Sequence, residues 1–367
     1  MREARMEKVK NWLSEKNIDA AFIHSTENVF YLTGFYTDPH ERLMGLFVFK
    51  EGEPFFICPG METGQAREAG WNGELIGYGD HEDPFQYIKN AADKRIGGKA
   101  AKLAAESELL SYSRAEQLIK TVQSEGLHPI EELLNEIRLV KDEKEIEILE
   151  KAAELADFGV QAGVNALKEG VTEMDVLAEI EYQLKRKGVS QMSFSTMVLF
   201  GKKSGQPHGN PGLDTLKKGD LVLFDLGVVL DGYCSDITRT VAFQSADEKQ
   251  KEIYQTCLEA NLAALEASKP GTRIGDLDLA ARKVIEDAGY GENFPHRLGH
   301  GLGISVHEYP SMAYTNNGVL KEGMVYTVEP GIYVPEIGGV RIEDDVLVTK
   351  DGCRTLTKFP KELQIIE

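Results

Sequence analysis

Residues 221–243 read LVLFDLGVVLDGYCSDITRTVAF. The dipeptide Asp231-Gly232 lies between two runs of alternating apolar residues, which is the strongest short-range sequence signal for a two-residue hairpin turn. With the turn at these two residues, Leu230 faces Tyr233 across the hairpin. The stretch therefore predicts two antiparallel strands whose register is fixed by their turn.

That register brings two acidic side chains together. It sets Asp225 opposite Thr238 and Gly227 opposite Asp236, so the two aspartates become diagonal neighbours on one face, about 7–8 Å apart at the backbone. A single aspartate is more often a surface or turn residue. Two carboxylates on one half-buried face would repel each other, and one would take up a proton unless a cation lay between them. The shared face therefore favours a metal site.

A second stretch, residues 296–310, reads HRLGHGLGISVHEYP and contains three histidines. The glycines between His296, His300 and His307 allow the backbone to approach a ligand closely. For His296 alone, a structural role and a ligand role are equally compatible with its neighbours.

Two glutamates lie in apolar runs near the end of the chain. Glu329 is in MVYTVEPGIYV and Glu343 is in VRIEDDVLV, and we expect both to be inside strands. A buried carboxylate needs a cation or several hydrogen-bond donors. Arg341 shares a strand face with Glu343, so an ion pair between these two residues is the structural alternative to metal binding.

Four carboxylates and one imidazole, without thiolates, form a ligand set that suits Mn²⁺, Co²⁺ or Fe²⁺ better than a structural zinc. Two such ions about 3.5–4 Å apart are compatible with this number of ligands.

The 367 residues suggest two domains. The runs AAFIHS, NVFYLTGF, MGLFVFK and EPFFICP are each typical of a strand, and they alternate with helical patterns, notably near residues 1–17 and 113–125. We therefore predict a small α/β domain over residues 1–130. Residues 131–367 open with helices, continue with the hairpin and end rich in strands, an order that indicates an α+β domain.

Composition excludes several classes of function. With 41 Lys and Arg against 60 Asp and Glu, the net charge of -19 would repel nucleic acids and anionic membranes. The four cysteines are far apart and form no CxxC pair, which indicates a reducing, cytoplasmic location. We find no signal peptide pattern and no apolar run long enough for a membrane span.

Together, these residues resemble a known family. Five side chains in this order and context are similar to the ligand set of the metallopeptidase clan that contains methionine aminopeptidase, aminopeptidase P and prolidase: Asp225, Asp236, His300, Glu329 and Glu343. HRLGHGLGISVHE resembles the prolidase and aminopeptidase P signature. ENVFYLTGF resembles the N-terminal domain of the creatinase, prolidase and aminopeptidase P branch. Methionine aminopeptidases lack that domain, and creatinase lacks the metal ligands.

The resemblance implies a pita-bread catalytic domain, a smaller creatinase-like N-terminal domain and a homodimer. It implies two divalent metal ions, with Mn²⁺ favoured. Asp225 would bind one ion, Asp236 and Glu343 would bridge both, and His300 and Glu329 would complete the shell of the second. A hydroxide held between the ions would then be the nucleophile.

By the same resemblance, His208, His307 and Glu329 would be catalytic, and the substrates would be small peptides containing proline. We favour hydrolysis of Xaa-Pro dipeptides. Two alternatives stay open: an aminopeptidase P acting on longer peptides, and a binding protein that has lost catalysis. A polar loop around Asp38, His40 and Arg42 is a further candidate for limiting substrate length.

Overall fold

The computed structural model describes residues 2–97 and 102–367, and these form two compact units, Met1–Arg138 and Leu139–Glu367. We had predicted the domain boundary after residue 130, where α6 (Glu131–Leu139) begins. In the structure nearly all of α6 belongs to the first unit, because the Tyr31 hydroxyl donates to the Ile137 carbonyl at 2.5 Å.

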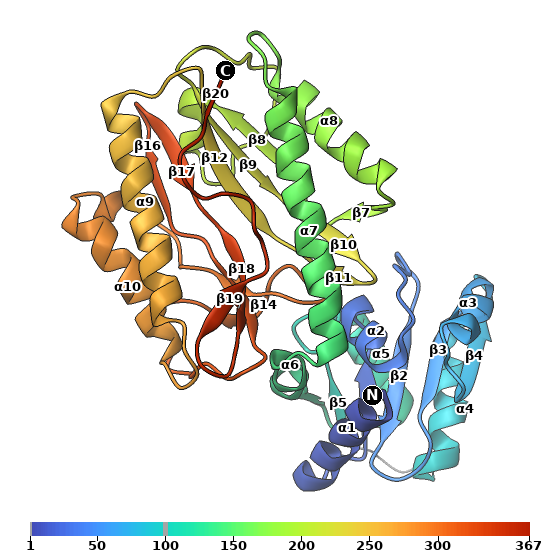
Figure 1. The fold of residues 1–367 in the computed structure, drawn as a ribbon. Coiled ribbons are helices and arrows are strands. Elements are labelled where there is room, and N and C mark those ends of the chain that lie inside the picture. Colours follow the sequence, from blue (N-terminus) through green and yellow to red (C-terminus); the bar gives the residue numbers. More distant parts are fainter. Residues whose placement is uncertain (1, 98–101) are drawn as a thin grey trace. The chain divides into compact units, whose positions relative to one another are not determined.

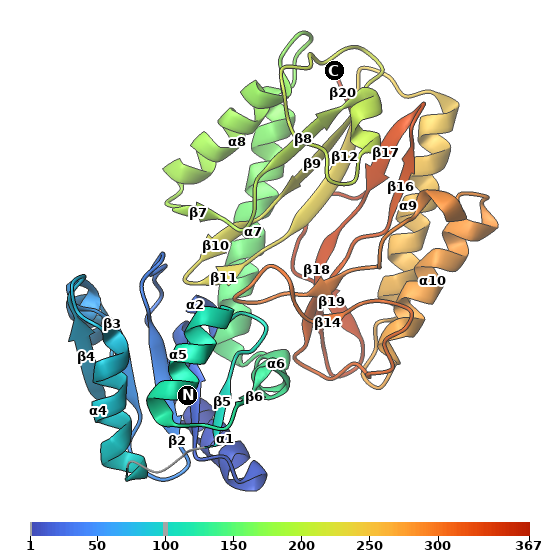
Figure 2. The ribbon, with the colours of Figure 1, turned by 180° about the vertical axis from the view of Figure 1, so that it is seen from behind.

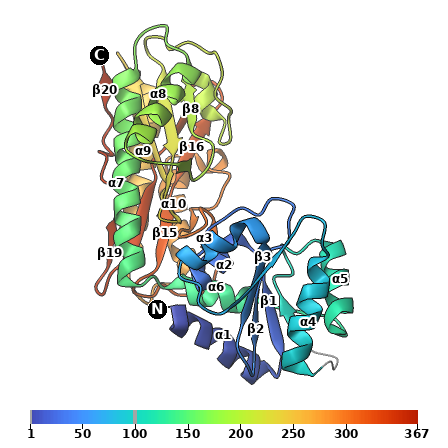
Figure 3. The same cartoon turned by 90° about the vertical axis from the view of Figure 1, so that its right-hand side faces the viewer.

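The first unit is a mixed sheet with helices on both faces (Figure 3). Its strand order is β4-β3-β2-β1-β5-β6. The strands are β1 (Ala20–Ile23), β2 (Gly45–Phe49), β3 (Phe55–Pro59), β4 (Glu74–Tyr78), β5 (Leu103–Ala105) and β6 (Leu127–Pro129). The other helices are α1 (Arg2–Lys16), α2 (Thr26–Thr33), α3 (Thr63–Glu68), α4 (Pro84–Ile96) and α5 (Tyr112–Val122), with a short 3₁₀ turn η1 (Gly60–Glu62).

Alternation along β2 explains why both faces of this sheet are covered. Phe47 and Phe49 pack into one core cluster with residues of α4 and α5. Leu46 and Val48 point to the opposite face and are also fully buried. A strand that is apolar at every position needs cover on both sides. The strand that we predicted from MGLFVFK is confirmed as β2.

One of the four predicted strands is wrong. NVFYLTGF forms most of α2, because its ends carry helix-capping residues. The Ser25 side chain accepts a hydrogen bond from the Asn28 N–H at the N-terminus. Gly34, with φ 82°, ends the helix in the left-handed conformation. The predicted helices near residues 1–17 and 113–125 are confirmed as α1 and α5.

The second unit begins with a helix pair, α7 (Glu143–Ala166) and α8 (Glu173–Arg186), and contains a second pair, α9 (Glu248–Ala267) and α10 (Ile274–Asp287). Strands lie between the pairs (Figures 1 and 2). Each pair has its own core: α7 and α8 pack on β8, β9 and β12, and α9 and α10 pack on β15 to β18. This is the expected pita-bread arrangement of helices and antiparallel sheets.

The strands of the second unit form four sheets. The orders are β20-β12-β9-β8, β14-β13-β15-β18-β19, β11-β10-β7 and β16-β17. The bounds are β7 (Gln191–Met192), β8 (Met197–Phe200), β9 (Leu221–Leu226), β10 (Val228–Leu230), β11 (Tyr233–Cys234), β12 (Ile237–Phe243), β13 (His300–Gly301), β14 (Glu308–Ser311), β15 (Val325–Val328), β16 (Gly331–Val334), β17 (Gly338–Arg341), β18 (Asp344–Val348), β19 (Cys353–Thr355) and β20 (Ile365–Ile366). Two 3₁₀ turns are η2 (Gly201–Gly205) and η3 (Gly291–Asn293).

The predicted hairpin register is confirmed. Leu230 pairs with Tyr233, and Asp225 pairs with Thr238. The strands are interrupted at Gly227, where an added Cβ would lie 1.9 Å from the Ser235 carbonyl oxygen, so only glycine fits. The interruption moves the chain from the four-stranded sheet into the three-stranded sheet.

No helix in the described residues is long and apolar enough to cross a bilayer.

Glu106, a buried carboxylate directly after β5, forms hydrogen bonds that connect β5 to the start of α2. Glu106 is 1% exposed and accepts from the backbone N–H groups of His24 and Ser25, at 2.5 and 2.9 Å. The Asn28 side-chain amide also donates to it at 2.6 Å. Burial alone would raise the pKa of Glu106, but its contacts with His24 and Ser25 lower that pKa to about 2.

We therefore expect Glu106→Gln to lower the free energy of unfolding by about 2–3 kcal/mol at pH 7. Because the folded pKa is depressed, this contribution is present above pH 4.5 and disappears as the pH falls toward about 2. Urea denaturation followed by tryptophan fluorescence measures it, since both tryptophans, Trp12 and Trp71, belong to the first unit. Glu125→Gln, at an exposed position, is the control. An equal loss at pH 7 and pH 2 would contradict the assignment.

Candidate functional site

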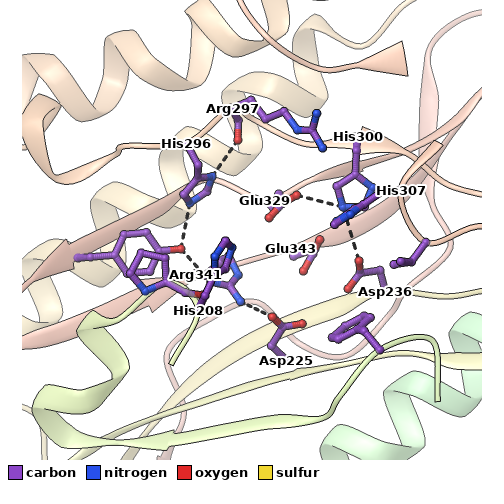
Figure 4. A pocket seen from close by; sticks show the side chains of 14 residues that line it. His208, Asp225, Asp236, His296, Arg297, His300, His307, Glu329, Arg341 and Glu343 are labelled. Carbon is purple, nitrogen blue, oxygen red and sulfur yellow. Dashed lines mark hydrogen bonds and ion pairs between the residues drawn. The ribbon is translucent and has the colours of Figure 1, made fainter. Parts of the chain in front are cut away.

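A pocket of about 360 Å³ in the second unit gathers the predicted site residues (Figure 4). It is lined by all five candidate metal ligands and by both additional candidate histidines: His208, Asp225, Asp236, His300, His307, Glu329 and Glu343. Seven further residues complete its wall: Phe194, Pro207, His296, Arg297, Val306, Tyr333 and Arg341. Positions that are up to 149 residues apart, from 194 to 343, therefore meet in one cavity.

The two glutamates lie at breaks between strands rather than inside strands as we had predicted. Glu329 follows β15 and precedes β16, and Glu343 lies between β17 and β18. At these breaks the chain passes from the five-stranded sheet to the two-stranded sheet and back. A continuous strand could not belong to both sheets, so the carboxylates occupy the irregular residues at which the chain changes direction.

His300 is oriented by its own neighbourhood. Its Nδ1 is 3.1 Å from the Gly301 carbonyl oxygen. A carbonyl can only accept, so Nδ1 carries the proton and Nε2 presents a lone pair. Nε2 lies 3.3 Å from Glu329 Oε1 and 3.7 Å from Asp236 Oδ2. A lone pair that faces two carboxylates is the arrangement expected around a cation.

Three buried carboxylate oxygens at the site have no hydrogen-bond partner: Asp225 Oδ1, Asp236 Oδ1 and Glu343 Oε1. Buried polar atoms are nearly always satisfied, so each such atom requires an explanation. One ligand atom each from Asp236, His300 and Glu343 lie within 4.8 Å of one another. The residues present therefore fit divalent cations, by their donor chemistry and by their unsatisfied oxygens.

The pKa values of the candidate ligands also indicate excess negative charge in the pocket. Burial, followed by the neighbouring carboxylates, raises the pKa of Asp236 well above its usual range. Burial likewise raises the pKa of Glu343, and it raises that of Glu329 to about 7. Burial also lowers the pKa of His300 to about 3. Four acids and one neutral imidazole in this space are most stable with added positive charge.

Arg341 pairs with Asp225 rather than with Glu343, so the alternative ion pair considered from the sequence is wrong. The Arg341 Nε donates to Thr238 Oγ1 at 2.9 Å, and the Thr238 hydroxyl donates to Glu343 Oε2 at 2.5 Å. Arg341 thus touches one candidate ligand directly and reaches a second through a hydroxyl. Strand alternation could not show this, because β17 ends at Arg341 and Glu343 lies beyond it.

His296, left open by the sequence, lines the pocket with both ring nitrogens hydrogen-bonded to protein. Nδ1 donates to the Arg297 carbonyl at 2.8 Å, so Nε2 accepts from the Tyr333 hydroxyl at 3.0 Å. That hydroxyl in turn accepts from Arg341 at 2.9 Å. Burial lowers the pKa of His296 to about 4, which keeps its ring neutral. These contacts suit a role for His296 in holding Tyr333 and Arg341 in place, not a role as a metal ligand.

Sequence reasoning missed Tyr333 and Arg297 as pocket residues. Tyr333 lies four residues after Glu329 on β16, where the apolar run gave no reason to single it out. Arg297 lies inside the histidine-rich stretch, and its side chain donates to Ser311 Oγ at 3.1 Å. Arg297 forms no salt bridge with an acidic side chain in the described part of the chain, but its charge acts on Glu329 and partly offsets the rise in the pKa of Glu329 that burial causes. Its position between two histidines is the sequence feature that could have pointed to Arg297 as a pocket residue.

Comparisons with known proteins identify the family of the chain. The model of metallopeptidase family M24 matches residues 147–350, and the creatinase/prolidase N-terminal domain matches residues 5–140. The chain is similar to "Putative dipeptidase YkvY" of Bacillus subtilis, with 65% identity over 99% of each chain.

Two solved structures are similar along nearly the whole chain. The prolidase from Pyrococcus horikoshii is 38% identical with a TM-score of 0.91, covering 98% of this chain and 100% of that one. The X-Pro aminopeptidase from Thermotoga maritima is 32% identical with a TM-score of 0.85, covering 96% and 99%. With a family model over more than half of its length and a full-length relative at 65% identity, the chain belongs to metallopeptidase family M24.

Proposed function

We propose that this chain is a metal-dependent dipeptidase that hydrolyses the bond before proline in Xaa-Pro dipeptides. The observation that carries the proposal is the convergence of five oxygen and nitrogen ligands in one pocket, with three buried carboxylate oxygens that lack partners. The retention of all five ligands speaks against a binding protein that has lost catalysis.

We assign the ligands as the family resemblance implies. Asp225, Asp236, His300, Glu329 and Glu343 would together hold two divalent ions. When bound, such a pair of ions supplies a water nucleophile of lowered pKa and a Lewis acid for the scissile carbonyl.

The other polar groups of the pocket act on the substrate. Burial, with a contribution from the nearby Arg297 charge, lowers the pKa of His307, so its ring is neutral near pH 7. A neutral ring can donate one N–H to the oxyanion that develops on the scissile carbonyl. His208 faces the same pocket and can donate in the same way. Glu329 can take a proton from the attacking water and pass it toward the leaving nitrogen.

Specificity for proline must come from shape. The amide nitrogen before proline carries no hydrogen, so no hydrogen bond to that nitrogen can select it. The apolar groups of Phe194, Pro207 and Val306 on the pocket wall offer surfaces on which a ring can pack. A cavity of about 360 Å³ is near the lower end of ligand pockets, which suits a small peptide.

Arg297 favours a dipeptide over a longer peptide. A dipeptide presents a free carboxylate directly behind the scissile bond. Arg297 provides a pocket guanidinium that donates to the Ser311 hydroxyl and forms no salt bridge among the described residues, although its charge also acts on Glu329. A charge-assisted hydrogen bond between these groups would be strong. A substrate of an aminopeptidase P has no carboxylate at this position, because its peptide continues beyond the proline.

The loop around Arg42 remains a second candidate for limiting length. In the first unit, Arg42 pairs with Asp80 at 2.8 Å and with Glu41 at 3.2 Å, so its charge is already compensated. We therefore assign recognition of the dipeptide carboxylate to the guanidinium of Arg297, and the role of the loop stays a prediction.

We further infer that Mn²⁺ is the metal, because the donors are hard oxygens with one imidazole. All four cysteines are free, which supports a reducing, cytoplasmic location. A homodimer is proposed from the family resemblance alone.

Asp225→Asn and Glu343→Gln should each abolish dipeptide hydrolysis and reduce bound metal, because hard cations require charged oxygens. Elemental analysis after dialysis against Mn²⁺ measures the metal, and release of proline from Ala-Pro measures activity. Asp231→Asn, in the hairpin turn outside the pocket, is the matched control. Wild-type metal content together with wild-type turnover in either site variant would remove the assignment.

His307→Ala and His208→Ala should lower kcat by about 100-fold, the usual scale for losing an oxyanion donor, while metal content stays at the wild-type level. Steady-state kinetics and elemental analysis on the same preparations separate the two effects. Near-normal kcat in both variants would reduce these histidines to bystanders.

Arg297→Gln should lower kcat/KM for Ala-Pro by about 10- to 100-fold through a higher KM, the scale of one charged hydrogen bond. The same variant should act on Ala-Pro-amide at close to the wild-type rate, because the amide has no carboxylate to lose. Equal losses on both substrates would contradict carboxylate recognition. A wild-type preference for Ala-Pro-Ala over Ala-Pro would favour the aminopeptidase P alternative.

A further inference from the structure

The two histidines that face the substrate both lie on irregular backbone. His208 follows η2 and precedes β9, and His307 lies between β13 and β14. Both residues are exposed to the pocket, and the His307 ring packs edge-to-face on the His300 ring with 4.1 Å between the centroids, a contact that orients the ring but does not hold the loop backbone. An oxyanion donor must nevertheless sit within about 2.7–3.1 Å of its target. Their loops therefore need another source of rigidity.

For His307 that source is the next residue. The Glu308 side chain is 5% exposed and turns inward, away from the pocket. Its Oε1 accepts from the Ser305 N–H at 2.9 Å, which closes the turn. The turn wraps so tightly around this carboxylate that a Cβ on Gly303 would lie 2.7 and 2.8 Å from its two oxygens.

The second oxygen of Glu308 pairs with a buried lysine. Lys141 Nζ lies 3.3 Å from Glu308 Oε2, and the lysine side chain is 2% exposed. The Lys141 backbone N–H donates to the Gly323 carbonyl at 2.8 Å, just before β15. Its neighbour Asp142 caps α7. The lysine is thus held by both a helix start and a strand start.

The loop of His208 is held in the same way. Glu173, the first residue of α8, is fully buried. Its Oε1 accepts from the Phe200 N–H at 2.9 Å, and its Oε2 accepts from the Gly212 N–H at 2.7 Å. These two residues bracket the segment that carries His208. Lys203 Nζ lies 2.6 Å from Glu173 Oε2 and 2.8 Å from Asp214 Oδ2, so its charge is shared between a buried and an exposed carboxylate.

We propose that each substrate-facing histidine is positioned by a lysine–glutamate pair whose glutamate is buried: Lys141–Glu308 positions His307, and Lys203–Glu173 positions His208. None of these four residues lines the pocket, so they act through the histidines and touch no substrate. A buried pair that loses one partner leaves an uncompensated charge, which the loop relieves by moving. A shift of about 1 Å in a catalytic group is enough to cost up to 100-fold in rate.

The inference rests on the proposed function, and double-mutant cycles test it. Lys141→Gln should lower kcat for Ala-Pro by about 10-fold, with metal content and KM close to wild type. In a His307→Ala background the same change should cost less than about 2-fold, because the positioned group is gone. In a His208→Ala background the full 10-fold loss should persist. Lys141→Arg, which keeps the charge, should restore most of the rate.

Lys203→Gln provides the matched control from the same chain. It should lose its effect in the His208→Ala background and keep its effect in the His307→Ala background. Because Lys203 is 22% exposed and Lys141 is 2% exposed, its effect should be the smaller of the two. The two crossed cycles separate positioning of one histidine from general loosening of the fold, which would slow every background alike.

Equal losses from Lys141→Gln in both histidine backgrounds would overturn the inference while leaving the proposed function intact. If His307→Ala and His208→Ala themselves retain the wild-type kcat, the proposed histidine roles fail and the positioning pairs fail with them. Should Lys141→Gln not fold by circular dichroism, Glu308→Gln takes its place in the cycle. The glutamine keeps the oxygen that accepts from Ser305 and removes only the charge.

Discussion

The second unit is organised around negative charge that has been taken out of water. Asp236 and Glu343 are 4% and 2% exposed, and each has a buried oxygen without a protein partner. Buried carboxylates of this kind are stable only when a cation or several donors compensate them. Arg341 supplies one positive charge, through Asp225. Divalent cations would balance the remaining negative charge. The breaks between strands place Glu329 and Glu343 on the wall of the pocket.

Much of this site could be predicted from the sequence because it depends on local rules. The Asp231-Gly232 turn fixed the register, so the positions of Asp225 and Asp236 followed from alternation along two strands. The three histidines were visible from their density among glycines. The family resemblance identified the five ligands as a set, and the structure brings all five into one pocket.

What the sequence could not reveal depends on tertiary contacts. Strand alternation paired Arg341 with Glu343, whereas Arg341, at the end of β17 in the two-stranded sheet, pairs with Asp225 on β9 of the four-stranded sheet. NVFYLTGF has the composition of a strand but becomes α2, since capping by Ser25 and Gly34 outweighs weak local preference. Lys141 and Glu308 are separated by 167 positions, and no periodicity links a lysine before a helix to the glutamate that follows His307.

The chain thus combines an acidic cavity whose donors fit divalent cations with polar groups suited to a short peptide, and lysine–glutamate pairs lie next to the two loops that carry His208 and His307. The most direct test of this account is to titrate metal-free protein with Mn²⁺ in a calorimeter while measuring release of proline from Ala-Pro on matched samples. The account predicts two ions bound per chain, with activity appearing only as the sites fill. Activity in the presence of a chelator, or the absence of Mn²⁺ binding, would contradict it.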